Sequence, residues 1–155
     1  MRLWVIRHAK AEHAAPSDAE RSLTAEGVAR FSLHVEGLAR LDTRFDRVLY
    51  SPWRRAAETA RLLEPLLSGE ALACDALARE PDAELLDALQ GTCVAVVGHE
   101  PWLTELVGLL VLGHREAGRA FELKKGGVVV LDGAPRPAGM RVRALLPPRV
   151  LRALR

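Results

Sequence analysis

Arginine, histidine or both follow a short apolar run at three places along the chain. The three groups are Arg7-His8, Ser51-Pro52-Trp53-Arg54-Arg55 and Gly98-His99-Glu100-Pro101. A guanidinium group stays charged and offers a planar fork of donors that matches the oxygens of a phosphoryl group. An imidazole among such charges has a lowered pKa, so it is neutral and nucleophilic near neutral pH. These residue types predict in-line attack of a histidine nitrogen on phosphorus, with arginine neutralising the phosphoryl oxygens.

The apolar runs that precede these groups predict buried strands at residues 3–6, 48–50 and 93–97. Later apolar runs at 128–131 and 142–146, separated by a Gly/Pro-rich turn, predict two strands that pair like a hairpin. A further short strand is expected at 71–74. Strands that alternate with helices predict an α/β fold. We expect three layers, α/β/α, around a mostly parallel central sheet with an antiparallel edge.

Capping residues and apolar spacing predict the helices between these strands. Thr24 caps a helix that runs to about Leu41, and Asp82 starts one that runs to Leu89. Ser51 is the expected cap of a helix that ends near residues 68–69, with Pro52 at its first position. Residues 101–113 predict the fourth helix. Ligands of such sheets bind beyond the carboxyl ends of the parallel strands, so we expect the three Arg/His groups to meet there.

Length and composition indicate one globular domain over residues 1–155. The net charge of +2 gives no case for nucleic-acid binding, and no apolar stretch is long enough to span a membrane. Two cysteines do not form a disulfide framework, which favours a cytoplasmic location. The basic residues are 19 Arg and 3 Lys, and Asn is absent. This composition is typical of a thermophile or of a GC-rich genome.

The Arg/His motifs resemble those of the histidine phosphatase superfamily, whose fold is phosphoglycerate mutase-like. The matching motifs are Arg7-His8-Ala9, Leu23-Thr24-x-x-Gly27, Ser51-Pro52-x-x-Arg55-Ala56-x-x-Thr59 and Gly98-His99-Glu100-Pro101. The short length, Arg21-x-Leu23-Thr24 and the third Arg/His group are most similar to SixA-type phosphohistidine phosphatases. The resemblance covers residues 2 to about 112, and motifs in the same order are far more specific than any one alone.

The resemblance implies a role for each matching residue. His8 is the expected nucleophile, which becomes phosphorylated, and His99 is the expected electrostatic stabiliser. Arg7 and Arg55 are the expected phosphate clamps, and no metal or other cofactor is expected. Arg21, on the loop before the first helix, either reaches the substrate or is an exposed surface residue. Ala9 departs from the glycine usual in this family, and we expect a slight adjustment of the backbone there.

The general acid and the substrate remain open at this point. The carboxylates that could protonate a leaving group are Glu12, Asp18, Glu80 and Asp82. A phosphohistidine of a protein is the favoured substrate, because its labile P–N bond needs a strong acid least and because the chain lacks the long insertion that covers the site of larger mutases. The alternatives are a small phosphate ester, hydrolysed by a phosphomonoesterase, and a non-catalytic phosphate-binding module. We expect a monomer or small homo-oligomer.

Three further expectations concern residues outside the motifs. Trp53 and Trp102 are expected in aromatic core or rim packing rather than stacked on a substrate. Surface or helix positions are expected for His13, His34 and His114, which have no partners at metal-ligand spacing. Residues 149–155 are expected to form a solvated terminal segment.

Overall fold

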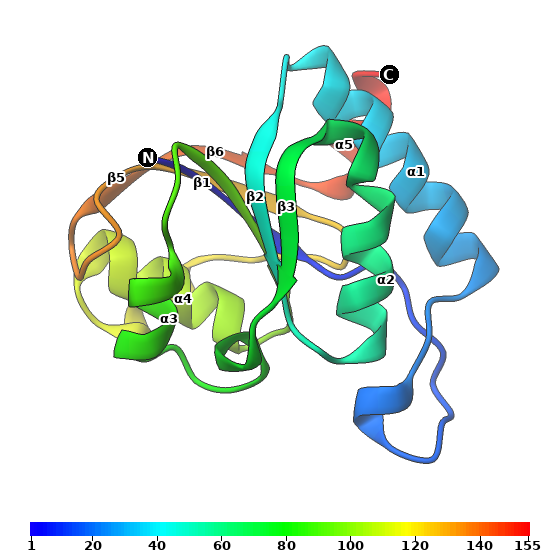
Figure 1. The fold of residues 1–155 in the computed structure, drawn as a ribbon, viewed down its shortest axis with the longest axis horizontal. Coiled ribbons are helices and arrows are strands. Elements are labelled where there is room, and N and C mark those ends of the chain that lie inside the picture. The colour runs from blue at the N-terminus through cyan, green and yellow to red at the C-terminus, as the bar shows by residue number, and fades with distance from the viewer.

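A six-stranded sheet forms the centre of the computed structural model, which describes residues 1–155 (Figure 1). Its strands, in chain order, are β1 (Arg2–Arg7), β2 (Phe45–Tyr50), β3 (Leu67–Ala73), β4 (Cys93–Gly98), β5 (Val128–Gly133) and β6 (Met140–Leu146). In space they follow the order β3-β2-β4-β1-β5-β6. The four strands from β3 to β1 are parallel, whereas β5 runs antiparallel to both β1 and β6. The predicted mostly parallel sheet with an antiparallel edge is confirmed.

Helices cover both faces of this sheet. They are α1 (Ala25–Arg40), α2 (Arg54–Leu62), α3 (Ala83–Ala88), α4 (Trp102–Leu112) and α5 (Pro148–Ala153), with short 3-10 turns η1 (Asp18–Glu20), η2 (Glu64–Leu66), η3 (Asp75–Ala78) and η4 (Arg115–Ala120). α1, α2 and α5 pack on one face, and α3 and α4 on the other (Figure 1). No helix has both the length and the apolar character of a membrane span.

Alternation along β1 explains how one strand serves two cores. Trp4 and Ile6 point into the core under α1 and α2, whereas Leu3 and Val5 point into the core under α4. Because successive side chains of a strand face opposite sides, an uninterrupted apolar run is what a strand covered on both faces requires. The same alternation divides residues 94–97 of β4 between the two cores.

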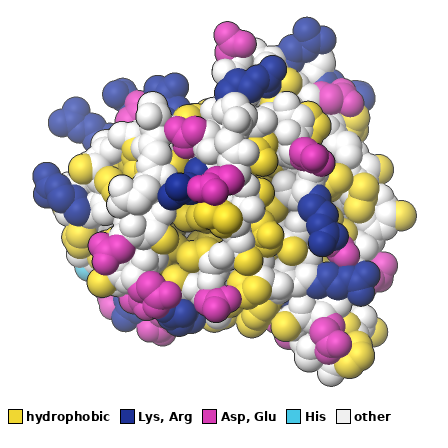
Figure 2. Space-filling model, viewed as in Figure 1, with side chains coloured by type: hydrophobic (Ala, Val, Ile, Leu, Met, Phe, Trp, Pro, Cys, Tyr) yellow, Lys and Arg dark blue, Asp and Glu magenta, His cyan; other side chains and the backbone are white.

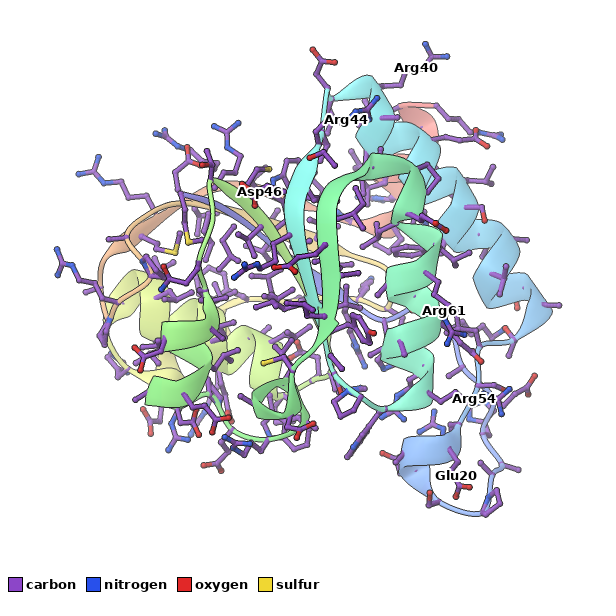
Figure 3. All side chains as sticks on the ribbon, viewed as in Figure 1. Glu20, Arg40, Arg44, Asp46, Arg54 and Arg61 are labelled. Atoms are coloured by element: carbon purple, nitrogen blue, oxygen red, sulfur yellow. The ribbon has the colours of Figure 1, made fainter.

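Asp46 aligns the start of β2 with the start of β4. Its Oδ2 accepts hydrogen bonds from the backbone N–H groups of Thr92 and Cys93, at 2.7 and 3.0 Å. Figure 3 shows Asp46 at the upper end of the sheet, where β2 begins. Anchoring both strands at this end fixes the level at which their opposite, carboxyl ends stop.

Two helix boundaries differ from the predicted ones. The second helix begins at Arg54 rather than after Ser51, so Ser51 is free to bond elsewhere. It ends at Leu62 and not near residue 68, because Pro65 has no backbone N–H to continue the α-helical hydrogen bonds, and residues 64–66 form η2 instead. The chain then enters β3 at Leu67, so the strand predicted at 71–74 starts four residues earlier.

The prediction of a solvated segment at residues 149–155 holds for most of these residues, which are exposed, but is wrong for Leu151. Pro147 and Pro148 begin α5, which packs against α1 and buries Leu151 completely. The two helices approach closely at Gly37, where an added Cβ would lie 2.0 Å from the Leu151 carbonyl oxygen. Leu151 thus anchors the segment in the core, because its apolar side chain meets a face of α1 that has a gap at Gly37.

The start of α1 holds the loop that follows β1. Thr24 caps the helix as predicted, its Oγ1 accepting from Gly27 N at 2.9 Å. The Lys10 carbonyl accepts from Thr24 N at 3.0 Å. A Cβ at Gly27 would stand 2.1 Å from that carbonyl oxygen, so only glycine lets the helix and the loop come this close.

Candidate active site

Three neighbouring strands end at the same level, which brings the Arg/His groups together. Arg7 at the end of β1 is paired with Gly98 at the end of β4, and Tyr50 of β2 is paired with Val97. The next residues are therefore side by side beyond the carboxyl edge. The rings of His8 and His99 have centroids 5.2 Å apart, and both side chains are buried.

The hydrogen bonds of His8 define which of its nitrogens can attack. Nδ1 lies 2.7 Å from the carbonyl oxygen of Ala9, and because a carbonyl only accepts, Nδ1 carries the proton. Nε2 of the neutral ring therefore holds the lone pair. Burial lowers the pKa of His8 to about 3, and the nearby His99, Arg55 and Arg7 lower it too. His8 is thus a neutral imidazole whose unprotonated nitrogen is Nε2.

Arg55 faces that nitrogen and is held by the segment after β1. Its Nε donates to His8 Nε2 at 3.1 Å. Nη1 and Nη2 donate to the backbone oxygen and Oδ2 of Asp18, at 2.6 and 3.1 Å. Arg54, by contrast, is exposed and donates to Glu58 Oε1, as expected for a residue that points away from the site (Figure 3).

Thr59 fastens α2 to the end of β1. Its hydroxyl donates to the Arg55 carbonyl at 2.7 Å and accepts from Ala9 N at 3.0 Å. Ala9 is buried in the core, and its φ is not positive. A side chain at position 9 therefore needs no unusual backbone conformation, and alanine fits where the family has glycine.

Arg7 and Arg21 complete the positive charge of the site. Arg7 Nη1 donates to the Leu123 carbonyl at 2.9 Å, and its buried Nε has no partner. Arg21, which is half-buried, donates to the Glu12 carbonyl at 2.6 Å and to Asp18 Oδ1 at 2.7 Å. Asp18 thus bridges Arg21 and Arg55 as an anion. Its hydrogen bond from Arg21 is the main reason that its pKa is lowered.

The four candidates for the general acid bond to different partners in the structure. Asp18 is the one candidate whose carboxylate pairs with arginines of the site, Arg21 and Arg55. Glu80 is exposed and pairs with Arg115 at 2.6 Å, while Asp82 caps α3 through Leu85 N. The exposed Glu12 contributes a backbone oxygen to Arg21. Glu80 and Asp82 follow η3, beyond the carboxyl end of β3, and their carboxylates are engaged by Arg115 and by Arg79 and Leu85 N.

Ser51 and the two tryptophans form the surroundings of His99. Ser51 Oγ lies 2.8 Å from His99 Nε2, whereas His99 Nδ1 is buried without a hydrogen-bond partner. The Trp53 ring lies 4.7 Å from the His99 ring and contacts Trp102 edge-on. Trp53 and Trp102 belong to neither core cluster and are partly buried, so of the two predicted kinds of packing it is rim packing that the structure shows, beside a site histidine.

The sequence analysis missed Ser51, Thr59 and Glu100 as residues that organise this site. Glu100 is half-buried and accepts from the hydroxyl of Thr104 at 2.6 Å, and burial raises its pKa. The motif spacing offered a signal for Ser51 and Thr59, since both stand within the second motif. Their partners, however, lie 48 and 50 residues away and only the strand register reveals them.

The comparisons with known proteins agree with this geometry. The model of the histidine phosphatase superfamily (branch 1) matches residues 3–80, which include β1 and the second Arg/His group. The chain belongs to this superfamily. Its membership of the superfamily indicates that the protein is a phosphatase. An uncharacterised protein of Picosynechococcus sp. is 31% identical over 147 residues, with 88% of each chain covered.

Solved structures share the histidine phosphatase fold along almost the whole chain. The protein histidine phosphatase SixA in complex with tungstate is 24% identical and superposes with a TM-score of 0.83, covering 97% of this chain and 99% of that one. The α-ribazole phosphatase of Shigella flexneri is 20% identical with a TM-score of 0.76, covering 96% and 97%. Since these enzymes differ in substrate, the likeness establishes the phosphoglycerate mutase-like architecture alone.

Replacing Ser51 with alanine should lower kcat of this histidine phosphatase by about 10-fold. The change removes the hydroxyl that holds His99 Nε2 and leaves a buried nitrogen without a partner. Ser32→Ala is the matched control, because Ser32 bonds only within α1. Steady-state kinetics with both variants checks the effect. An unchanged kcat in Ser51→Ala would show that Ser51 does not position His99.

Stability should fall as the pH drops below about 6.5. The pKa values of His8 and His99 lie at about 3 and that of His34 at about 4, against 6.5 when unfolded. Below pH 6.5 these three histidines are therefore protonated in the unfolded chain but remain neutral in the folded chain. Each histidine then lowers the free energy of unfolding by about 1 kcal/mol for every unit by which the pH falls. This loss continues until the pH reaches the folded pKa.

Replacing His34 measures the contribution of one histidine to this pH dependence of stability without altering the catalytic cluster. Burial is the main cause of the lowered pKa of His34, followed by Arg152, whose Nη1 is 3.0 Å from His34 Nε2, and by Arg30. Urea unfolding of His34→Gln between pH 6 and 5 should show a pH slope about 1 kcal/mol per unit shallower than the parent. The same slope in both proteins would contradict the prediction.

Proposed function

We propose that this protein removes the phosphoryl group from a phosphohistidine of another protein through a covalent intermediate on His8. The observation that carries the proposal is the state of His8. Its Nδ1 is committed to the Ala9 carbonyl, its lone pair lies on Nε2, and that nitrogen faces the Arg55 guanidinium. A neutral, oriented imidazole beside a phosphate-binding arginine is what nucleophilic attack on phosphorus requires.

In the first step, the hydrogen bond from Arg55 Nε to His8 Nε2 breaks, and the freed lone pair of Nε2 attacks phosphorus in line with the bond that breaks. A bond forms between Nε2 and phosphorus while the P–N bond of the substrate breaks. Arg7 and Arg55 neutralise the phosphoryl oxygens, and the free Nδ1 of His99 offers another contact to them. The phosphoryl group takes over the donors of Arg55 that Asp18 occupies in the structure.

In the second step, water attacks the phosphorylated His8. A P–O bond forms, the bond between phosphorus and Nε2 breaks, and inorganic phosphate leaves. The lone pair returns to His8 Nε2, and the water proton leaves with phosphate or solvent. Because the Ala9 carbonyl keeps hold of the Nδ1 proton throughout, the ring keeps its orientation through both steps.

The leaving group is the reason to favour phosphohistidine over an ester. Asp18, the candidate acid nearest the arginines, has a lowered pKa and is an anion at neutral pH. A phosphohistidine whose second ring nitrogen is protonated releases a neutral imidazole, so no carboxylic acid has to supply a proton. An alkoxide leaving group, in contrast, needs such an acid. The ion pairs of Asp18 therefore support a phosphoramidate substrate.

Turnover of matched substrates tests the proposal. Two peptides of one sequence, carrying phosphohistidine or phosphoserine, are compared with p-nitrophenyl phosphate. We expect kcat/KM to be at least about 100-fold higher for phosphohistidine, and EDTA to leave that rate unchanged because guanidinium groups supply the positive charge. A preference for either ester would identify a phosphomonoesterase instead. No turnover of any substrate, despite phosphate binding, would identify a binding module.

A further inference from the structure

All three lysines of the chain line one cavity beside the catalytic cluster. The cavity has a volume of about 540 Å³, and its cationic lining residues are Arg7, Lys10, Arg30, Lys124, Lys125 and Arg152. We refer to these six residues as the basic basin. No Asp or Glu lines it, although the chain has 20 acidic against 22 basic residues. In contrast, acidic and basic side chains are mixed on the face shown in Figure 2.

The basic basin is joined to the catalytic backbone by hydrogen bonds. The Lys124–Lys125 pair precedes β5, the antiparallel neighbour of β1. Directly after the pair, Gly126 N donates to the carbonyls of Arg7 and His8, at 3.0 and 3.1 Å. Directly before it, the Leu123 carbonyl accepts from Arg7. The lysine pair is thereby held at the side of the nucleophile, and Arg7 belongs to both sites.

The positive charge of the basin is only partly balanced within the chain. Lys10 and Arg30 share one carboxylate, that of Glu26. Lys124 Nζ lies 3.7 Å from the exposed carboxylate of Glu122. Arg152 is hydrogen-bonded to His34, which is neutral at pH 7. Lys125 forms no ion pair, and burial together with Arg7 and other cations lowers its pKa. Such a concentration of one sign attracts an anionic partner.

We propose that the basic basin binds acidic side chains that flank the phosphohistidine of the substrate protein. The inference rests on the proposed function. Rigid arginine forks make up the catalytic cluster, which suits a phosphoryl group, whereas every lysine is in the basin. Lys10 and Lys124 are about half exposed or more, at 47% and 65%. Flexible, exposed ammonium groups spread over a broad hollow match the scattered carboxylates of a protein surface better than one compact polyphosphate.

Two phosphohistidine peptides of equal length test this specificity. One has Asp and Glu on both sides of the phosphohistidine, and the other has Ser and Gln. At low salt we expect kcat/KM to be about 10- to 100-fold higher for the acidic peptide, and the ratio to shrink as salt screens the charges. Lys124→Glu should lower this ratio toward one. Arg141→Glu is the matched control, because Arg141 is exposed on β6 and does not line the cavity.

Labelling of His8 by phosphoramidate, a donor without flanking residues, reports the catalytic site separately. If the wild-type protein is not labelled, the proposed function fails. If labelling occurs but both peptides react equally, or if Lys124→Glu keeps the full preference, the docking inference is overturned. Inhibition by tripolyphosphate that is far stronger than by phosphate and is relieved by Lys124→Glu would overturn it too, because the basin would then bind a small polyanion.

Discussion

Replacing His8 with asparagine is expected to lower kcat/KM by about 10⁴-fold or more and to abolish the acid-labile phosphoryl group on the protein. Asparagine keeps a polar group near the Ala9 carbonyl but has no nitrogen lone pair to attack phosphorus. The effect is the largest we expect from any single substitution, because neither covalent step has an alternative nucleophile at this position. Rapid-quench labelling with phosphoramidate, followed by acid treatment, measures the intermediate directly.

His13→Asn is the matched control for this variant. His13 is exposed on the same loop and bonds to none of the catalytic residues, so it should leave labelling and turnover unchanged. Thermal unfolding of both variants at pH 7.5 distinguishes a lost nucleophile from a lost fold. Labelling of His8→Asn as strong as that of the parent would show that another residue carries the phosphoryl group.

The edge of the sheet where the site forms could be predicted from local sequence alone. Apolar runs of three to five residues that stop abruptly at Arg7, Ser51 and Gly98 mark strands covered on both faces. Parallel strands bring their carboxyl ends to one edge, so His8 and His99 had to be neighbours. The register then sets their separation, and it depends on contacts such as those of Asp46 with the start of β4.

The partners of these histidines could not be predicted in the same way. Serine before proline is a good helix cap, yet Ser51 bonds to His99 because α2 starts two residues later than its cap would suggest. The selection of Asp18 among four carboxylates depends on the path of a loop without periodic pattern. The apolar content of the last seven residues did not distinguish a solvated tail from α5, since the gap at Gly37 is a tertiary feature.

Arg55 tests whether the shape of a guanidinium group matters at this site beyond its charge. Its Nε–H donates to His8 Nε2. Its Nη1 and Nη2 donate to Asp18, so they reach the position that Asp18 occupies. The three donors lie in one plane, so one side chain can orient the nucleophile before attack and hold phosphoryl oxygens during it. The ammonium group of lysine has the same charge but cannot span both positions.

Arg55→Lys should therefore lower kcat/KM by about 10² to 10³-fold while His8 remains able to accept phosphate slowly. The loss should appear mainly in kcat, because the donors act most strongly when charge develops on the phosphoryl oxygens. Arg54→Lys, on the outer side of the same helical turn, is the control that should keep the parent rate. If Arg55→Lys turned over substrate within about threefold of the parent, charge alone would explain the role of Arg55. The planar fork would then have no part in catalysis.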